Sequence, residues 1–363
     1  MGAYNPAGVV SLSIAPNLGA QNPGTARLSA LSPLYRFSAG LTTNPIPLIA
    51  VVGPTGAGKS ELAIHLAREL GGEIVGCDSV QVYSGVNIGS AKVPLEERSR
   101  IPHHLLDVVP PTQKLTAGAY ARLGRKAIAE IAGRGCLPIV VGGTGLYLRA
   151  LLEGLSPAPP RDEEFRIRLG RAAGHRPQLL ARYLRRFDPE SATRIHPNDR
   201  QKLTRAVELC HVSRRPASAI QQLSRDELTG IEVLKLGLNP DRSLLYDRLN
   251  ARAQWMFANG LLEETAWLAD LLGDSAAEVL RSLGYSQALH YLRGDCSLGN
   301  AIADCQTKTR NYAKRQMTWF RSDPSIRWID EFGSTDRARA LALGFATTFL
   351  GHSAPETFSS ERT

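Results

Sequence analysis

Residues 48–60, which read LIAVVGPTGAGKS, decide the fold of this protein. Leu48–Val52 is a short apolar run that ends at a glycine, which is typical of a buried parallel strand. Gly53–Ser60 matches the Walker A pattern of a phosphate-binding loop. Three leucines spaced four apart then share one stripe of a helix expected over 59–70. The strand, the loop and the helix together predict the first unit of an α/β fold.

The glycine-rich loop has the residue types that a phosphate site needs. Its glycines let the backbone curl so that several N–H groups point at phosphate oxygens, and the helix N-terminus adds to the attraction. Lys59 supplies a positive charge to the terminal phosphate, and Ser60 is the candidate Mg²⁺ ligand. The predicted binding residues are Gly53, Pro54, Thr55, Gly56, Ala57, Gly58, Lys59 and Ser60. The motif predicts a phosphate or diphosphate site and leaves the reaction open.

Apolar runs and helical patterns alternate along the rest of the chain. We expect further strands at 73–77, 137–141, 231–238 and 326–329. Helices are expected at 117–132, where Thr116 is the cap, at 146–152, and over most of 241–320. This alternation predicts a P-loop NTPase-like, doubly wound parallel sheet, interrupted by a basic helical insertion.

The expected domain boundaries follow these changes in pattern. They are a disordered or leader extension over 1–44, the first part of the core over 45–160, the insertion over 161–225, the second part of the core over 226–335, and a C-terminal helix and tail over 336–363. The first 44 residues hold no acidic side chain, because the first in the chain is Glu61. We interpret them as a disordered extension rather than a transit peptide, because they lack a basic amphipathic pattern.

The charge distribution favours a polyanionic partner. The net charge is +9, and residues 161–215 hold fourteen Lys and Arg against seven Asp and Glu. Residues 307–321 hold five basic side chains and no acid, with Tyr312, Trp319 and Phe320 among them. A solvated helical surface is the alternative for each block taken alone. Two such blocks together favour nucleic acid.

Other features exclude several classes of protein. No apolar stretch is long enough to cross a bilayer. The five cysteines are scattered and form no C-x-x-C pair, which argues against a disulfide framework or a zinc site and suits a reducing, cytoplasmic compartment. His103 and His104 have no third ligand at a suitable spacing, so we assign them structural or surface roles.

The expected catalytic residues follow from strand ends. A kinase needs an apolar strand that ends in a metal-binding Asp, but the strand 137–141 ends in Gly142-Gly143-Thr144. Asp78 instead follows the strand 73–77. Carboxyl ends of neighbouring parallel strands face one crevice, so Asp78, Thr144 and the phosphate loop should converge. Asp78 is then either a general base or a residue that binds Mg²⁺ or caps a turn.

The helix after residue 241 supplies two further expectations. Arg248 and Arg252 are four residues apart and share one face, which suits surface ion pairs or an anion clamp. The run Trp255–Phe257 is expected to pack in the core.

The chain resembles the tRNA dimethylallyltransferases, also called tRNA isopentenyltransferases, over about residues 46–330. Besides the phosphate loop, the segments that carry the resemblance are Asp78–Tyr83, Asn87–Lys92, Pro102–Asp107, Gly142–Tyr147, Leu151–Leu155, Ile195–Asp199 and Ala313–Arg321. So many ordered blocks are not a chance match.

The resemblance implies a Mg²⁺-dependent prenyl transfer from dimethylallyl diphosphate to the adenosine immediately 3′ of the anticodon of tRNA. It implies that Asp78 is the general base, that Thr144 contacts the bridging oxygen, and that Arg252 stabilises the leaving diphosphate. It implies tRNA contacts from Asp78, Ser79, Val80, Gln81, Thr144, Arg166, Gln201, Lys202, Leu203, Thr204, Arg205, Arg281, Gly284 and Tyr285. It also implies a helical insertion that binds tRNA and a monomeric enzyme.

Two departures and three competing functions accompany this hypothesis. Ser286 stands where family members have Arg, and no paired Cys and His follow Trp328, which favours a bacterial or plastid-type enzyme without a zinc finger. An adenylate isopentenyltransferase would share the chemistry but would not need the two basic blocks. A P-loop nucleotide kinase and a non-catalytic RNA-binding module are the second and third competing functions. The motif also leaves open whether ATP binds.

Overall fold

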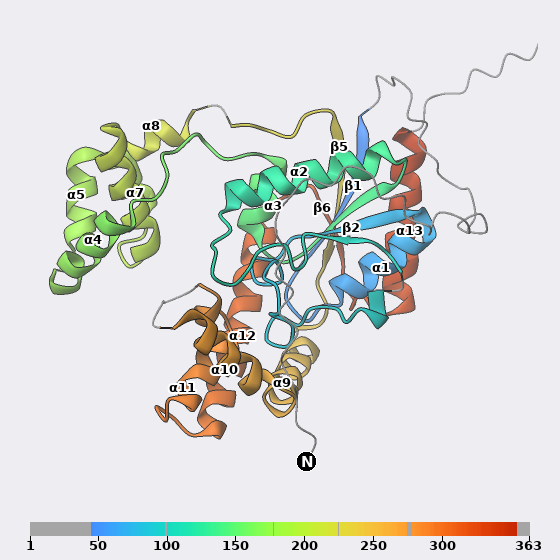
Figure 1. The fold of residues 1–363 in the computed structure, drawn as a ribbon. Coiled ribbons are helices and arrows are strands. Elements are labelled where there is room, and N and C mark those ends of the chain that lie inside the picture. The colour runs from blue at the N-terminus through green and yellow to red at the C-terminus, as the bar shows by residue number, and fades with distance from the viewer. Residues whose placement is uncertain (1–44, 99, 177, 224, 274–277, 354–363) are drawn as a thin grey trace, which may run out of the picture. The chain divides into compact units, whose positions relative to one another are not determined.

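The computed structural model describes residues 45–353 apart from residues 99, 177, 224 and 274–277 (Figure 1). The expected extension over 1–44 and the end of the chain after residue 353 lie outside the described residues. No helix among the described residues has the length and apolar character to cross a membrane.

A parallel six-stranded sheet forms the centre of the core, which confirms the predicted fold class. Its strands are β1 (Ile46–Val52), β2 (Gly72–Gly76), β3 (His103–His104), β4 (Leu137–Val141), β5 (Ile231–Leu238) and β6 (Ile326–Ile329). The spatial order is β3-β2-β4-β1-β5-β6. The chain therefore moves outward from β1 to β3, returns to β4, and continues on the other side through β5 and β6. This order places the ends of β1, β2 and β4 side by side, where a doubly wound sheet binds ligands.

Helices cover the sheet and confirm the expected alternation. The helices beside the sheet are α1 (Lys59–Leu70), α2 (Ala117–Gly133), α3 (Gly145–Leu152) and α13 (Asp336–Ser353). Four others pack mainly on one another in a second hydrophobic cluster: α9 (Arg242–Ala258), α10 (Leu261–Leu272), α11 (Tyr285–Leu292) and α12 (Leu298–Phe320). Leu48, Ala50 and Val52 point to one face of β1 and pack in a cluster with residues of α2 and α3. Helices α1 and α13 lie beside each other and also contact the sheet (Figure 1).

The basic insertion is helical, as expected, and has a hydrophobic cluster of its own. Its helices are α4 (Glu163–His175), α5 (Leu179–Phe187), α6 (Pro189–Arg194), α7 (Arg200–Ser213) and α8 (Ala217–Gln221). All members of this cluster come from these helices and the turns between them. The buried Asp188 accepts hydrogen bonds from Ser191 N at 3.1 Å and Ser218 Oγ at 2.7 Å, which ties α6 to α8.

Two local expectations need correction. Met256 and Phe257 are buried as predicted, but Trp255 is 57% exposed because it points away from the packed face of α9. The two-residue strand β3 was not predicted, because a pair of histidines carries no strand pattern. His104 Nε2 lies 2.6 Å from Glu73 Oε2 and His103 Nδ1 lies 2.7 Å from Ile101 O, so both histidines have structural contacts, as expected.

Candidate active site

The phosphate loop joins β1 to α1, as its sequence predicts. Gly56 and Gly58 have φ angles of 80° and 87°, which residues with a side chain rarely adopt. A Cβ at Gly58 would also lie 2.9 Å from Gly333 N. The loop therefore needs glycine for its backbone shape and for its close packing against the segment before α13.

Two cations of the site are partly buried without an anionic partner. Lys59 Nζ donates to Pro54 O at 2.8 Å, and burial lowers the pKa of Lys59 to about 8. Arg252 Nη2 donates to Thr55 Oγ1 at 2.8 Å, and burial lowers the pKa of its guanidinium. Neither side chain forms an ion pair within the part of the chain that the structure describes. An anion bound between them would offset the electrostatic cost of their burial.

Asp78 lies beyond the end of β2 and uses one carboxylate oxygen locally. Oδ1 accepts from Val80 N at 2.8 Å and from Gln81 N at 3.3 Å, so Asp78 does cap a turn. No hydrogen bond to Oδ2 occurs among the described residues, and the side chain lines both main cavities of the site. One oxygen thus orients the carboxylate, and the other keeps its capacity to accept a proton or a hydrogen bond.

Thr144 lies at the start of α3, beside the segment that follows β2. Its Oγ1 accepts from Ser79 N at 3.1 Å, and Thr144 N donates to Cys77 O at 3.3 Å. Thr144 therefore meets the segment that holds Asp78, and the preceding Gly143 lines the first cavity with the phosphate loop, whereas Thr144 is not among the residues that line either cavity. This arrangement arises because β1, β2 and β4 are adjacent in the sheet.

Two cavities meet at this edge of the sheet. The first, of about 480 Å³, is lined by Thr55, Gly56 and Gly58–Glu61 of the phosphate loop and α1, and by residues of α9 and α13. The second, of about 360 Å³, is lined by the segments Asp78–Val80 and Gly89–Ala91 and by residues of α9, of the turn before α11, and of α12. Thr55, Asp78 and Arg252 line both cavities. The two cavities together form one chamber. The phosphate loop and its cations line one end, and Asp78 lies where the two ends meet.

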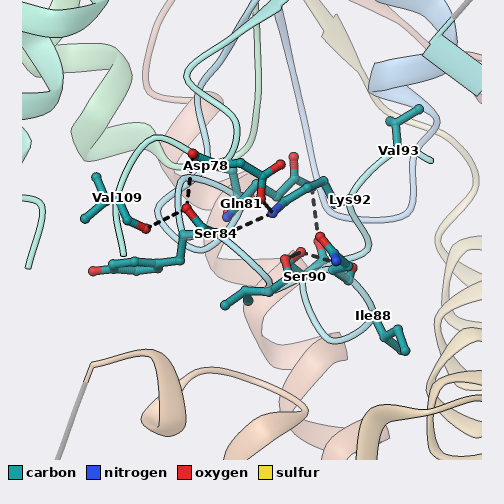
Figure 2. A network of polar contacts seen from close by, with 12 residues as sticks. Asp78, Gln81, Ser84, Ile88, Ser90, Lys92, Val93 and Val109 are labelled. Atoms are coloured by element: carbon teal, nitrogen blue, oxygen red, sulfur yellow. Dashed lines mark hydrogen bonds and ion pairs between the residues drawn. The ribbon is translucent and has the colours of Figure 1, made fainter. Parts of the chain in front are cut away.

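A hydrogen-bonded loop follows Asp78 (Figure 2). Residues of this loop form a wall of both cavities. Gln81 Nε2 donates to Ser90 O at 3.0 Å and so closes the loop. Lys92 is buried and donates to Tyr83 O at 2.9 Å and to Asp107 Oδ1 at 2.7 Å. The side chain predicted to contact tRNA at position 81 therefore also holds this wall in place.

Sequence reasoning assigned no role to three residues that hold this site together: Lys92, Glu264 and Gln316. Glu264 of α10 accepts hydrogen bonds from the backbone N–H groups of Asn87, Ile88 and Gly89. The signal available in the sequence was the resemblance of Asn87–Lys92 and Ala313–Arg321 to family blocks. Glu264 had no such signal, because its contacts join positions about 175 residues apart.

The predicted tRNA contacts in the insertion differ in exposure. Gln201 and Lys202 are exposed on α7, Thr204 is half-buried, and Leu203 is buried in the cluster of the insertion. Arg166 Nη1 and Arg205 Nη1 lie 3.2 and 2.8 Å from Oε2 of the buried Glu208. Burial alone would raise the pKa of Glu208, but hydrogen bonds from Arg205 and the Asp162 backbone lower it. This carboxylate holds both predicted tRNA-binding arginines.

The predicted contacts near α11 also divide into two kinds. Arg281 is exposed and lines the second cavity together with Gly284. Tyr285 is fully buried, and its hydroxyl donates to Glu264. In this structure Tyr285 therefore supports the wall of the cavity through Glu264.

A divalent ion at this site would need ligands beyond the protein's own side chains. No group of three His, Cys, Asp or Glu side chains within the described ranges can hold a metal ion. Ser60 lines the first cavity at the N-terminus of α1, where its hydroxyl can complete the coordination of an ion held by phosphate oxygens and water.

Comparisons with known proteins agree with this geometry. The family model described as IPP transferase matches residues 81–323, and the model described as isopentenyl transferase matches residues 46–103. The tRNA dimethylallyltransferase of Solibacter usitatus is 50% identical over 306 residues, which cover 84% of this chain and 100% of the relative. The one from Koribacter versatilis is 53% identical over 287 residues, which cover 79% and 93%.

Solved structures show the same relationship. The full-length tRNA isopentenylpyrophosphate transferase of Bacillus halodurans aligns with a TM-score of 0.64 at 34% identity, covering 85% of this chain and 97% of that one. A eukaryotic dimethylallyltransferase acting on tRNA aligns with a TM-score of 0.69 at 28% identity, covering 85% and 80%. These relatives support a prenyltransferase rather than a nucleotide kinase or a non-catalytic module. The chain belongs to the tRNA dimethylallyltransferase family.

Proposed function

We propose that this protein transfers the dimethylallyl group of dimethylallyl diphosphate to the N6 amine of the adenosine 3′ of the anticodon in tRNA. A C–N bond forms, the bond between carbon and the bridging oxygen breaks, and diphosphate leaves. The observation that carries the proposal is the position of Asp78, Thr55 and Arg252 in both cavities. The donor and the acceptor amine would meet at these three residues.

The phosphate loop would bind the diphosphate in the first cavity. Its backbone N–H groups and Lys59 would contact phosphate oxygens, and Arg252 would face the charge that grows as the carbon–oxygen bond breaks. Mg²⁺, held by Ser60 and the diphosphate, would neutralise part of that charge. The lowered pKa of Lys59 and of Arg252 supports this role, because both cations are desolvated where an anion would lie.

Asp78 would accept the proton that N6 loses during attack. Its Oδ1 is fixed by two backbone N–H groups, so Oδ2 has a defined direction. The Thr144 hydroxyl, now bonded to Ser79, would turn to the bridging oxygen.

The acceptor adenosine would be unstacked from the anticodon loop and enter the second cavity, because its amine is otherwise hidden by stacking. The other tRNA contacts are proposed for the backbone or side chains at 79–81, 166, 201–205, 281 and 284–285. Exposed cations such as Lys202 and Arg281 suit the phosphate backbone. We also propose a monomer that works in the cytoplasm.

A transfer assay tests the proposal directly. The protein and Mg²⁺ are incubated with labelled dimethylallyl diphosphate and either tRNA or AMP. We expect label in tRNA and none in AMP. Asp78→Ala or Asp78→Asn should lower kcat by about 10²- to 10⁴-fold, with tRNA affinity retained, because a general base contributes in that range. Label in AMP alone, or an active Asp78→Asn protein, would contradict the proposal.

A further inference from the structure

Gln316 of α12 joins two loops at the end of the sheet. Its side chain is buried, and its Oε1 accepts from Thr55 N at 2.8 Å while its Nε2 donates to Gly143 O at 2.8 Å. The two partners are 261 and 173 residues away in the sequence. One carboxamide thus ties the phosphate loop to the segment between β4 and Thr144.

Thr55 also contacts Arg252, which has a role in the proposed reaction. Thr55 is held through its backbone N–H by Gln316 and through its Oγ1 by the guanidinium of Arg252. Gly143, Gln316, Thr55 and Arg252 therefore form one hydrogen-bonded series. The series ends at Arg252, which lines both cavities.

We propose that Gln316 is a positioning residue for prenyl transfer. It fixes Thr55, and through Thr55 the direction of the Arg252 guanidinium, while through Gly143 it fixes the neighbouring Thr144. This inference rests on the proposed function, because it assigns Gln316 to the alignment of the diphosphate between these groups. Misplacing such groups by about 1 Å can cost about 10²-fold in rate.

The chemistry of position 316 requires an amide. Thr55 presents a donor and Gly143 presents an acceptor, and a carboxamide supplies the matching acceptor and donor together. Leucine has a similar size but would leave the partly buried Thr55 N–H and the buried Gly143 carbonyl without this partner. An ionised glutamate would still accept from Thr55 N but would place a second oxygen against Gly143 O.

The contact with Gln316 also requires a glycine at position 143. A Cβ at position 143 would lie 2.1 Å from Gln316 Nε2, so a larger residue there would displace the amide. Gly142 is restricted in the same way, since a Cβ there would lie 2.0 Å from Cys77 O. The glycine pair after β4 therefore lets α12 and Cys77, the residue after β2, approach this loop closely.

The first experiment compares two leucine variants of the same helix. Gln316→Leu should lower kcat by at least about tenfold with little change in the KM for tRNA. Gln306→Leu is the matched control, because Gln306 of α12 donates to Asn250 O at 3.1 Å and not to the phosphate loop. We expect its kcat to stay within about threefold of the parent, as for loss of one partly buried contact. A loss below tenfold for Gln316→Leu, or an equal loss in both variants, would overturn the inference.

A second variant separates positioning from a general loss of packing. In Gln316→Glu the buried carboxyl should have a raised pKa, and its neutral form can donate to Gly143 O while it accepts from Thr55 N. The ratio of its kcat to that of the parent should rise at least about fivefold as the pH falls from about 8.5 to about 6. The ratio cancels titrations that both proteins share, such as that of Lys59 in the same cavity.

A ratio that stays flat with pH would overturn the assignment of the donor role to Gln316. A failure of this inference is distinguishable from a failure of the proposed function. In the first case the parent labels tRNA and the Gln316 variants do so equally well. In the second case the parent itself does not label tRNA.

Discussion

The site at the sheet edge and the helical insertion differ in the partners of their cationic side chains. At the sheet edge, Lys59 and Arg252 are partly buried with only neutral oxygens as partners. In the insertion, Arg166 and Arg205 share the buried carboxylate of Glu208. Burial lowers the pKa of Lys59 and of Arg252, whereas hydrogen bonding from Arg205 contributes to a lowered pKa of Glu208.

The difference shows what each region is built to do. A desolvated cation without an acid raises the energy of the empty site and is relieved by a bound anion, so the unpaired cations indicate the substrate side. A buried carboxylate with two arginines is already neutralised, so it stabilises the shape of the insertion and fixes where the guanidinium groups lie.

The largest effect is expected from Arg252→Met. Removing this cation should lower kcat by about 10²- to 10³-fold, because it would stabilise the charge on the leaving diphosphate. Affinity for tRNA, measured by filter binding at fixed salt, should change little. Arg248→Met is the comparison, since Arg248 is four residues away but already pairs with Glu61 at 3.0 Å. An equal loss of kcat in both variants would contradict the contrast between unpaired and paired cations.

Glu208→Gln should destabilise the insertion. The change removes the buried carboxylate that Arg166 and Arg205 share, while Arg166 keeps a longer contact with Glu163 Oε2 at 3.7 Å. Losing the buried partner costs about 2–3 kcal/mol when the arginines keep some solvent contact. Hydrogen exchange of amides in α4 and α7 would report this loss. Glu190→Gln, at an exposed position, is the control and should change stability by less than about 0.5 kcal/mol. Unchanged exchange in α4 would show that Glu208 does not hold the insertion.

Acid should weaken the same contact. The pKa of Glu208 lies below the ordinary glutamate value of 4.5 in the folded protein, so the unfolded state binds more protons as pH falls. The stabilisation is complete above pH 4.5 and is lost as the pH falls through the folded-state pKa. The protection of α7 amides, measured relative to their intrinsic exchange rates, should therefore fall more steeply below pH 4.5 in the parent than in Glu208→Gln. Parallel pH profiles in the two proteins would refute this linkage.

The smallest effect is expected at Trp255. Its side chain is 57% exposed, so Trp255→Ala should change the free energy of unfolding by less than about 0.5 kcal/mol in urea titrations. Phe257→Ala, two residues later on the same helix, removes a buried ring and should cost about 3–5 kcal/mol. A large loss of stability from Trp255→Ala would show that the exposed face of α9 is packed.

Much of the fold followed from local pattern. The ranges of α1, β4, β5 and β6 were predicted correctly, because their apolar pattern and, for α1, β4 and β5, a flanking glycine define them locally. Trp255 was misplaced, because hydrophobic character alone does not say which side of a helix faces the core. Strand β3 was missed, because its pairing with β2 supplies the geometry that a histidine pair does not encode.

The sequence by itself predicted the phosphate loop and the parallel sheet, because these depend on residue type and local pattern. The family resemblance supplied the expected roles of Asp78, Thr144 and Arg252. Only the tertiary structure decided that Thr55, Asp78 and Arg252 line both cavities and that Gln316 bridges two loops. The physical reason is that a hydrogen bond depends on distance in space. Hydrogen-bond partners that are 173 and 261 residues apart produce no local sequence pattern from which the contact could be predicted.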